Sequence, residues 1–339
     1  MKPRIRFLPQ LLLLLCLAFF TVPAFADNLA MHVIDVGQGD SIFVQFPNGS
    51  TMLVDAGPGD AGPTVVRYLK DLGVRKIDIL VLTHPHSDHL GGMADVLDAF
   101  EIGKVWDSGY QHGSGLQRRF LETVAKKKIR FGRPKAGFSE RVGSAVVDIL
   151  APVREISGTK GDVNNNCLVL RISYGRFTAL LMADAEKEER EAVGTFPQSA
   201  VIKVSHHGSH NGTDAAFLRQ VRPEEAVISC AAENDYGHPH KATIQALERA
   251  GVVWHSTAKA GPVVISSDGR VLFLKTGTYR PEPKPTPAAM TGGVIGNSKS
   301  KVFHLPTCEG LPDENKQVRF DDRDDAIRAG YKPCGRCKP

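Results

Sequence analysis

The sequence has 339 residues, with 42 Lys and Arg against 37 Asp and Glu, and a formal net charge of +5. A hydrophobic fraction of 42% with 23% charged residues is ordinary for a globular protein. This composition argues against wholesale disorder, a collagen-like fibre or a disulfide-dense miniprotein. At about 100 to 200 residues per domain, the length predicts two domains.

The first 26 residues have the organisation of a secretory signal peptide. Three basic residues precede an apolar run over residues 11–20, and the small residues Ala24 and Ala26 occupy the positions that a signal peptidase inspects. A retained membrane anchor is the alternative, but about ten unbroken apolar residues fall short of the roughly 20 that span a bilayer. Lipid attachment at Cys16 is disfavoured because Leu15, rather than a small residue, precedes it. We expect an exported protein, periplasmic or extracellular, without stable membrane insertion after cleavage.

A proline-rich segment separates two better patterned regions. Residues 281–293 contain four prolines and two glycines, a composition typical of a semi-rigid, exposed linker. We predict a large domain over 27–280, a linker over 281–296 and a small domain over 297–339. The large domain has equal numbers of basic and acidic residues, so net charge alone gives no argument for nucleic-acid binding.

Short apolar runs alternate with amphipathic segments through the large domain, which predicts an α/β fold. Its second part repeats this order of strands followed by strand–helix alternation, and two sheets with helices on their outer faces would bury the pattern. In chain order we expect strands over 31–35, 41–45 and 51–55, a helix over 64–72, a strand over 77–83, helices over 91–100 and 117–128, strands over 145–150, 167–173 and 177–183, a helix over 186–193, a strand over 200–205, a helix over 213–220, a strand over 225–230, a helix over 243–250 and a strand over 261–266.

Four potential metal ligands follow the apolar strand IDILVLT within six residues: His84, His86, Asp88 and His89. A loop at a strand end can turn such side chains inward to one point. Neutral imidazoles with a carboxylate suit zinc, manganese or iron, so ligand type does not fix the metal.

The HxHxDH loop resembles the signature of the metallo-β-lactamase superfamily, which implies a four-layer αββα fold. The resemblance assigns His84 and His86 to a first metal, and Asp88 and His89 to a second. Further strand ends match later motifs of the superfamily: Asp55 as a structural carboxylate, Asp184 as the metal-bridging carboxylate and His206 as the last ligand of the second metal.

Finer motifs resemble the hydrolase domain of the ComEC competence family: DVGQGD, HPHSDHLGG, DVNNNCLVL, KVSHHGSH and YGHPH. In DVGQGD, the glycines permit a tight turn, and Asp35 and Asp40 are expected to support it. One departure concerns the first metal, because asparagines stand where many superfamily members have a third histidine. Asn165 or Asn166 is a substitute ligand, weaker than imidazole. A single-metal enzyme is the alternative to a two-metal one.

The expected chemistry is attack by a metal-activated hydroxide on a phosphodiester. Asp88 and Asp184 would hold the metals and orient the hydroxide, and His238 is the first choice as phosphate binder or general acid. Further candidates for contact with phosphate or substrate, several of which would otherwise be ordinary loop residues or helix caps, are His207, Ser209, His210 and His240.

A run of basic residues, 126–135, is the strongest positive patch in the neutral domain. It could guide a phosphate backbone. It is equally well explained as a solvated helix end whose cations offset the helix dipole.

The small domain contains His304 and Cys308, which 25 intervening residues separate from Cys334 and Cys337. Two half-sites at this spacing predict a structural zinc site, and so few residues need such a staple. The segment resembles the zinc-binding module of the Ada DNA-repair protein and implies a small zinc-stapled α+β module. Because His304 replaces the first cysteine, methyl transfer is doubtful, whereas DNA docking remains. A disulfide between Cys334 and Cys337 is the alternative in an oxidising compartment.

The leading hypothesis is therefore an exported phosphodiesterase or nuclease acting on DNA. We expect two divalent ions, zinc or manganese, in the hydrolase domain, one structural zinc in the small module, and DNA as the partner. The sequence identifies no protein partner. Two other hypotheses remain: a small-molecule metallohydrolase that opens a lactam, lactone or thioester, and a non-catalytic DNA-binding protein.

Overall fold

The computed structural model describes residues 28–277 and 294–337, except residues 307, 309, 321–325, 328 and 336. The described part of the chain forms two compact units, a large one over residues 28–277 and a small one that begins at residue 294. The predicted signal peptide and most of the predicted linker lie outside the described residues. Within the described part, no helix has the length and hydrophobicity needed to cross a membrane.

The large unit contains two mixed β-sheets, sheet A and sheet B. Sheet A has the strand order β15-β14-β1-β2-β3-β4-β5-β6, and sheet B has the order β13-β12-β11-β10-β9-β8-β7. The strands of sheet A are β1 (Leu29–Val33), β2 (Ile42–Gln45), β3 (Thr51–Val54), β4 (Lys76–Leu82), β5 (Glu101–Asp107), β6 (Arg130–Gly132), β14 (Val263–Ser267) and β15 (Leu272–Thr276). Those of sheet B are β7 (Ser139–Val142), β8 (Ala145–Ala151), β9 (Val169–Tyr174), β10 (Phe177–Leu181), β11 (Val201–Lys203), β12 (Glu225–Ile228) and β13 (Val253–Ser256).

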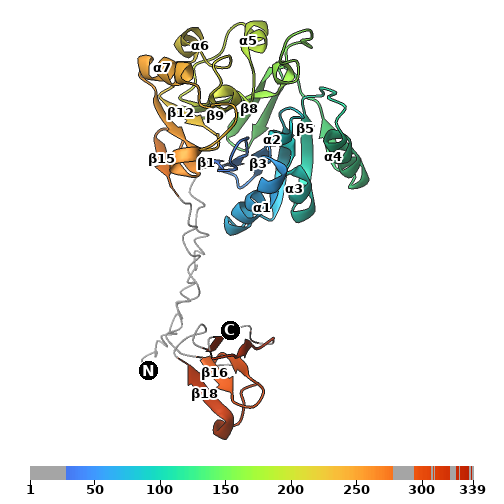
Figure 1. Ribbon diagram of the computed structural model, residues 1–339, viewed down its shortest axis with the longest axis vertical. Helices are drawn as coiled ribbons and strands as arrows, with labels where there is room; N and C mark the ends of the chain where they lie inside the picture. Colours follow the sequence, from blue (N-terminus) through green and yellow to red (C-terminus); the bar gives the residue numbers. More distant parts are fainter. Residues whose placement is uncertain are drawn as a thin grey trace, which may run out of the picture. The chain divides into compact units, whose positions relative to one another are not determined.

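Helices cover the outer face of each sheet (Figure 1). Those on sheet A are α1 (Gly62–Asp71), α2 (Ser87–Leu90), α3 (Met93–Ala99) and α4 (Gly115–Lys126). The second half adds α5 (Lys187–Val193), α6 (Ala215–Val221), α7 (Lys241–Arg249) and the short α8 (Thr257–Ala260).

Three layers of buried apolar side chains separate these elements. Alternate residues of β3 show the principle: Met52 and Val54 face sheet B, whereas Leu53 faces the helices. A third cluster joins sheet B to α5, α6 and α7. Strands buried on both faces read as continuous apolar runs, as residues 79–82 do. The predicted four-layer αββα fold is confirmed.

The parallel pairing of strands within each sheet determines where the predicted site residues lie. Strands β3, β4, β5 and β6 run parallel to one another, as do β10, β11, β12 and β13. The carboxyl ends of parallel strands meet at one edge of a sheet, where ligands of open α/β sheets bind. The motif residues follow β3, β4, β10 and β11 at these edges.

Several elements differ from the sequence prediction. The strands β5, β6, β7, β13 and β15 and the helices α2 and α8 were not expected. In β5, the sequence EIGKVWD interrupts the apolar run with Gly103 and Lys104, and β6 has only three residues. Pairing with neighbouring strands, rather than local hydrophobicity, fixes such strands.

The small unit contains a four-stranded sheet with the order β18-β16-β17-β19. Its strands are β16 (Val294–Asn297), β17 (Val302–His304), β18 (Gln317–Phe320) and β19 (Lys332–Pro333). Four buried apolar residues, Val294, Phe303, Ala326 and Tyr331, form its core. A core this small needs a staple to hold a fold.

Candidate metal centre

Loops from both sheets bring the predicted ligands to one place. His84 and His86 follow β4, and Asp88 and His89 lie on α2 immediately after them. Asp184 follows β10 in sheet B. Each half of the fold therefore supplies side chains that the other half lacks.

Two groups of potential ligand atoms share Asp184. In each group, the atoms lie within 4.8 Å of one another. The first consists of His84, His86 and Asp184, and the second of Asp88, His89, Asp184 and His207. A carboxylate common to both groups is the arrangement that a bridged pair of divalent ions needs.

Buried polar atoms without partners test whether a metal fits here. His89 Nε2 and Asp184 Oδ1 are buried, have no hydrogen-bond partner and lie 3.3 Å apart. Asp88 Oδ2 lies 3.8 Å from the same nitrogen. Buried polar groups are normally satisfied, so the convergence of unsatisfied imidazole and carboxylate atoms fits a divalent metal.

A hydrogen bond with Asp55 fixes the ring orientation of His89. His89 Nδ1 donates to Asp55 Oδ2 at 2.7 Å, which leaves Nε2 directed at Asp184 and Asp88. The backbone N–H and hydroxyl of Thr83 also donate to Asp55. Such a carboxylate–histidine pair fixes the tautomer and ring orientation of a metal ligand.

His207, rather than His206, joins the second ligand group. The sequence assigned the ligand role to His206 and a substrate role to His207, but His207 Nε2 lies 3.1 Å from Asp88 Oδ2 and 3.4 Å from Asp184 Oδ2. His206 Nδ1 instead lies 3.3 Å from Glu186. His206 Nε2 remains 3.7 Å from Asp184, so His206 flanks the second group without being part of it.

The sequence does not predict a role for Lys203, which contacts His207 through the carboxylate of Asp40. Lys203 is fully buried, and its Nζ lies 2.9 Å from Asp40 Oδ1. The same oxygen lies 3.3 Å from His207 Nδ1, which also contacts the Ser229 carbonyl at 3.0 Å. Although burial opposes its ionisation, Lys203 and His207 lower the pKa of Asp40 to about 2. Asp40 thus supports His207 through these contacts. The signal for Lys203 in the sequence is a charged residue within the apolar strand VIKV.

In the asparagine loop, hydrogen bonds hold the side chains of the two residues that the sequence offers as substitute ligands. Asn165 Oδ1 accepts the Glu189 N–H at 3.2 Å, and Asn166 Oδ1 accepts the Ile156 N–H at 2.9 Å. Their amide nitrogens are also bonded within the loop and to α5. The side-chain amides of both asparagines therefore have partners within the loop and on α5.

His238 lies near the mouth of the site. Its ring centroid is 5.6 Å from that of His206 and 6.2 Å from that of His207, and Gln38 Nε2 approaches its Nδ1 at 3.4 Å. Burial, reinforced by the neighbouring His207 and His206, lowers the pKa of His238 to about 4. A neutral imidazole at pH 7 suits the predicted phosphate binder better than the general acid.

The other predicted substrate residues have local partners. The His210 backbone N–H donates to His240 Nδ1 at 3.0 Å, and Ser209 is buried with its carbonyl accepting from Thr243. Asp35 accepts the Gly37 N–H at 3.2 Å, which supports the expected turn. His240 contacts the His238 ring, with centroids 4.9 Å apart, so His210 and His240 lie next to His238. Ser209 and Asp35 stabilise the local backbone instead.

The ligands differ in charge state. Burial lowers the pKa of His84 and His86, which keeps both imidazoles neutral as metal ligands must be. Burial also disfavours the charged form of His89, but the carboxylates of Asp184 and Asp88 outweigh it and raise the His89 pKa. His207 and His89 likewise hold the pKa of Asp184 well below its usual range, despite burial. The second group is therefore a compact set of opposite charges, and an ion that binds there would displace the protons of its imidazoles.

Unusual backbone conformations aim these side chains. Asp55, Ala183, His206 and His207 have φ values of 58°, 45°, 48° and 52°. Non-glycine residues rarely adopt this left-handed region and keep it at sites where the surrounding structure compensates its energy. All four lie at or next to the ligand groups.

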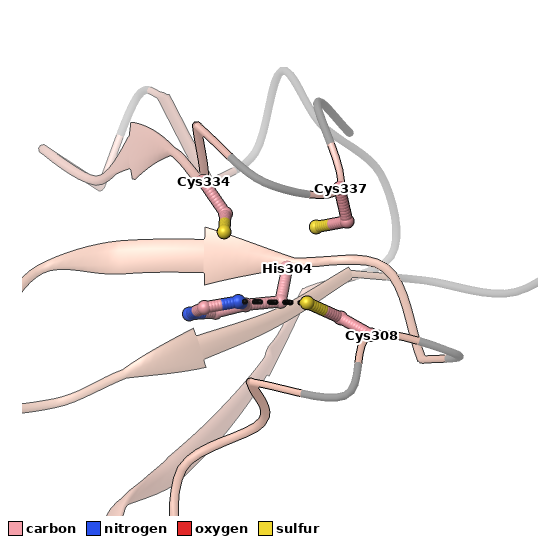
Figure 2. A group of neighbouring side chains, drawn as sticks. All are labelled: His304, Cys308, Cys334 and Cys337. Carbon is pink, nitrogen blue, oxygen red and sulfur yellow. Dashed lines mark hydrogen bonds between the residues drawn. The ribbon is translucent and has the colours of Figure 1, made fainter.

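The small unit contains the second metal site. Figure 2 shows His304 and Cys308 facing Cys334 and Cys337 across one small space. The four ligand atoms lie within 4.8 Å of one another, and His304 Nδ1 is 3.4 Å from Cys308 Sγ. The convergence of all four groups fits a Cys₃His zinc site.

Comparison with known sequences identifies both units. Residues 34–232 match the model of the Metallo-beta-lactamase superfamily, and residues 287–339 match that of the Metal binding domain of Ada. The large unit is related to ComE operon protein 3 of Bacillus subtilis (strain 168), with 29% identity over 74% of this chain and 35% of that protein. Competence protein ComA of Neisseria gonorrhoeae is 32% identical over 67% of this chain and 30% of that protein. The chain thus spans about a third of the length of the curated relatives it matches.

Comparison with solved structures supports the fold. The metallo-beta-lactamase fold protein YhfI from Bacillus subtilis aligns with a TM-score of 0.51 and 13% identity, over 71% of this chain and 100% of that chain. The predicted resemblance to the superfamily, to the competence family and to the Ada module is confirmed.

Proposed function

The chain belongs to the metallo-beta-lactamase superfamily, and from that premise we propose that it is an exported, metal-dependent phosphodiesterase that cleaves DNA. The observation that carries the proposal is the convergence of two ligand groups on Asp184. Two ions joined by one carboxylate suit phosphoryl displacement, because they can stabilise both the attacking and the leaving oxygen.

The residues present would hold the ions in a defined way. His84 and His86 would bind one ion, Asp88, His89 and His207 the other, and Asp184 both. When bound, such a pair would lower the pKa of a water molecule toward about 7 and polarise a phosphoryl oxygen. Asp88 remains 29% exposed at its side chain, so this carboxylate can accept a hydrogen bond from the attacking water and orient it. His238, next to the ligand groups, would donate a hydrogen bond to a phosphate oxygen.

DNA as the substrate draws support from two sources. The relatives that share the large unit include Competence protein ComA, and the second unit matches the Metal binding domain of Ada. A zinc module that docks DNA would raise the local concentration of substrate at the metal centre without adding contacts to it. The features of a signal peptide in residues 1–26 support export to the periplasm or beyond.

The test offers the purified exported chain several substrates in zinc or manganese: single- and double-stranded DNA, bis(p-nitrophenyl) phosphate and a chromogenic lactam. We expect hydrolysis of DNA and of the model phosphodiester. Hydrolysis of the lactam alone would overturn the phosphodiesterase in favour of a small-molecule hydrolase. Binding of DNA without hydrolysis of any substrate would leave a non-catalytic binding protein.

A matched pair of variants identifies the responsible pocket. Asp184→Ala removes the shared carboxylate and is expected to abolish turnover, whereas Asp71→Ala changes an exposed carboxylate at the end of α1 and should not. DNA cleavage that survives Asp184→Ala would show that another enzyme in the preparation is responsible. Metal content measured on the same samples reports whether Asp184→Ala also loses bound ions.

A further inference from the structure

A basic cavity lies beside the metal centre and is not used by the proposed chemistry. Its volume is about 480 Å³, within the range of pockets that bind small ligands. Its lining includes Tyr110 after β5, Arg133 and Lys135 after β6, and Arg154 after β8, together with Asn166 of the asparagine loop. The Ala136 N–H donates to the Pro152 carbonyl at 3.1 Å and joins the segments after β6 and β8.

The cations of this cavity are not neutralised by ion pairs. Arg133, Lys135 and Arg154 are exposed, and none of them forms an ion pair with another residue that the structure describes. Glu155 also lines the cavity, and buried Asp107 lies near Arg133. Three free cations against one exposed carboxylate make a local positive potential in a domain with no net charge.

The cavity and the metal centre share one edge of sheet A. Strands β4, β5 and β6 are parallel neighbours, so the loops after them lie side by side. The His112 ring, in the β5 loop that lines the cavity, contacts the His86 ring with centroids 5.8 Å apart. Because adjacent strands are about 4.8 Å apart, the cations lie within reach of phosphates next to one held at the metals.

Aromatic side chains accompany the cations. Tyr110 lines the cavity, and Phe131 is 37% exposed with the Arg133 guanidinium 5.5 Å from its ring centroid. Exposed aromatic faces beside cations bind single strands, because unpaired bases stack on them. On the other side of the site, Glu233 and Asp235 line a cavity that also contains His238. Charge therefore favours the β6 side as the path of a polyanion.

We propose that this cavity binds the phosphates and one base of a single DNA strand next to the bond that is cleaved. Arg133, Lys135 and Arg154 hold backbone phosphates, and Tyr110 stacks on the base. The proposal rests on the proposed function and specifies that the substrate is a single strand. This strand would run from the metal centre toward the β6 side of sheet A.

The first test measures binding by the metal-free full chain, so it does not depend on turnover. The probe is a fluorescein-labelled oligothymidylate of about 20 nucleotides, followed by anisotropy. Arg133→Ala/Lys135→Ala/Arg154→Ala should raise Kd at least about 10-fold and lower the slope of log Kd against log salt by about 2, since each single-strand phosphate contact contributes about 0.7. The matched control neutralises three exposed cations of the α1 region, Arg67, Lys70 and Arg75. An equal Kd for the wild type and the cavity variant would overturn the proposal.

The second test distinguishes a single strand from other phosphate ligands. Tyr110→Ser should weaken oligothymidylate binding about 5-fold or more, because stacking of one base contributes about 1 to 3 kcal/mol, and should leave binding of a duplex unchanged. Equal losses for both nucleic acids would overturn the single-strand assignment. Loss of thymidine diphosphate binding alone in the triple variant would assign the cavity to a small phosphorylated molecule instead.

Kinetics separate this proposal from the proposed function. In the metal-loaded protein, the triple variant should raise KM for the oligonucleotide about 10-fold and keep kcat/KM for bis(p-nitrophenyl) phosphate, which has only one phosphate. A wild type that cleaves no DNA contradicts the proposed function, whereas a wild type that cleaves DNA with an unchanged KM in the variant contradicts only the cavity.

Discussion

Glu189 is the buried acid whose ionisation we expect to limit the stability of the large unit at high pH. It lies on α5 and is 1% exposed. Its Oε2 accepts the thiol of Cys167 at 3.0 Å, and its Oε1 is buried without a hydrogen-bond partner. Burial raises the pKa of Glu189 from 4.5 to about 8.

The direction of the effect follows from the two pKa values. Below pH 4.5, both the folded and the unfolded chain carry a protonated Glu189. Between pH 4.5 and 8, the unfolded chain loses this proton and the folded chain keeps it, so stability falls as pH rises. The full loss is about 5 kcal/mol, because each unit of pKa difference corresponds to about 1.4 kcal/mol.

The assay is urea unfolding of the metal-free chain at several pH values from about 5 to about 8.5, for the wild type and Glu189→Gln. Glutamine keeps the shape and an oxygen that accepts the Cys167 thiol, but it does not ionise. We expect similar stabilities near pH 5 and a variant that is several kcal/mol more stable near pH 8.5. Other groups titrate in both proteins, so their difference isolates Glu189. Parallel curves across this range would refute the reasoning.

Three further changes have definite expected outcomes. Lys203→Met removes the ammonium that pairs with the buried carboxylate of Asp40 and should destabilise the large unit by about 3 to 5 kcal/mol in urea unfolding. The double variant Lys203→Met/Asp40→Asn should regain much of the lost free energy of unfolding, and fully additive effects of the two substitutions would contradict the ion pair. Gly39 has a φ of +145°, and Gly39→Ala would put a Cβ 2.2 Å from the Asp88 carbonyl oxygen. The substitution should therefore displace the loop that carries Asp88 and reduce turnover of bis(p-nitrophenyl) phosphate at least about 10-fold. Gly59→Ala is the control that should be tolerated, because the atom nearest to its Cβ would be 3.9 Å away. Cys337→Ser should remove one equivalent of zinc, measured by mass spectrometry of the native protein, and keep hydrolysis of the same small phosphodiester; an unchanged zinc content would refute the Cys₃His site.

The sequence predicted the layers and the location of the site because both depend on strong, local patterns. Buried parallel strands appear as apolar runs, and the dense motif from His84 to His89 follows one of them directly. Asp184 also follows such a strand. The carboxyl edges of the sheets then bring these loops together without any further information.

Other features depended on geometry that no local pattern carries. Spacing alone does not decide which of His206 and His207 faces the ligand group, because both have left-handed backbone conformations that set their directions. The asparagine loop matched a ligand position in sequence, but Asn165 and Asn166 use their carbonyl oxygens within the loop and for α5. Lys203 stands in an apolar strand, and its burial is explained by the approach of Asp40 and by a hydrogen bond to the Val204 carbonyl.

The second ligand group combines side chains from the loops of both sheets. Asp88 and His89 belong to the loops of sheet A, and Asp184 and His207 to those of sheet B. An ion bound there would act as a clamp, since separating the sheets would break half of its bonds. Binding to the folded state alone adds about 4 kcal/mol of stability when the free ion is at 1,000 times its Kd. The melting temperature of this protein should therefore rise with the concentration of free metal, so that heat resistance reports how much metal the surrounding compartment supplies.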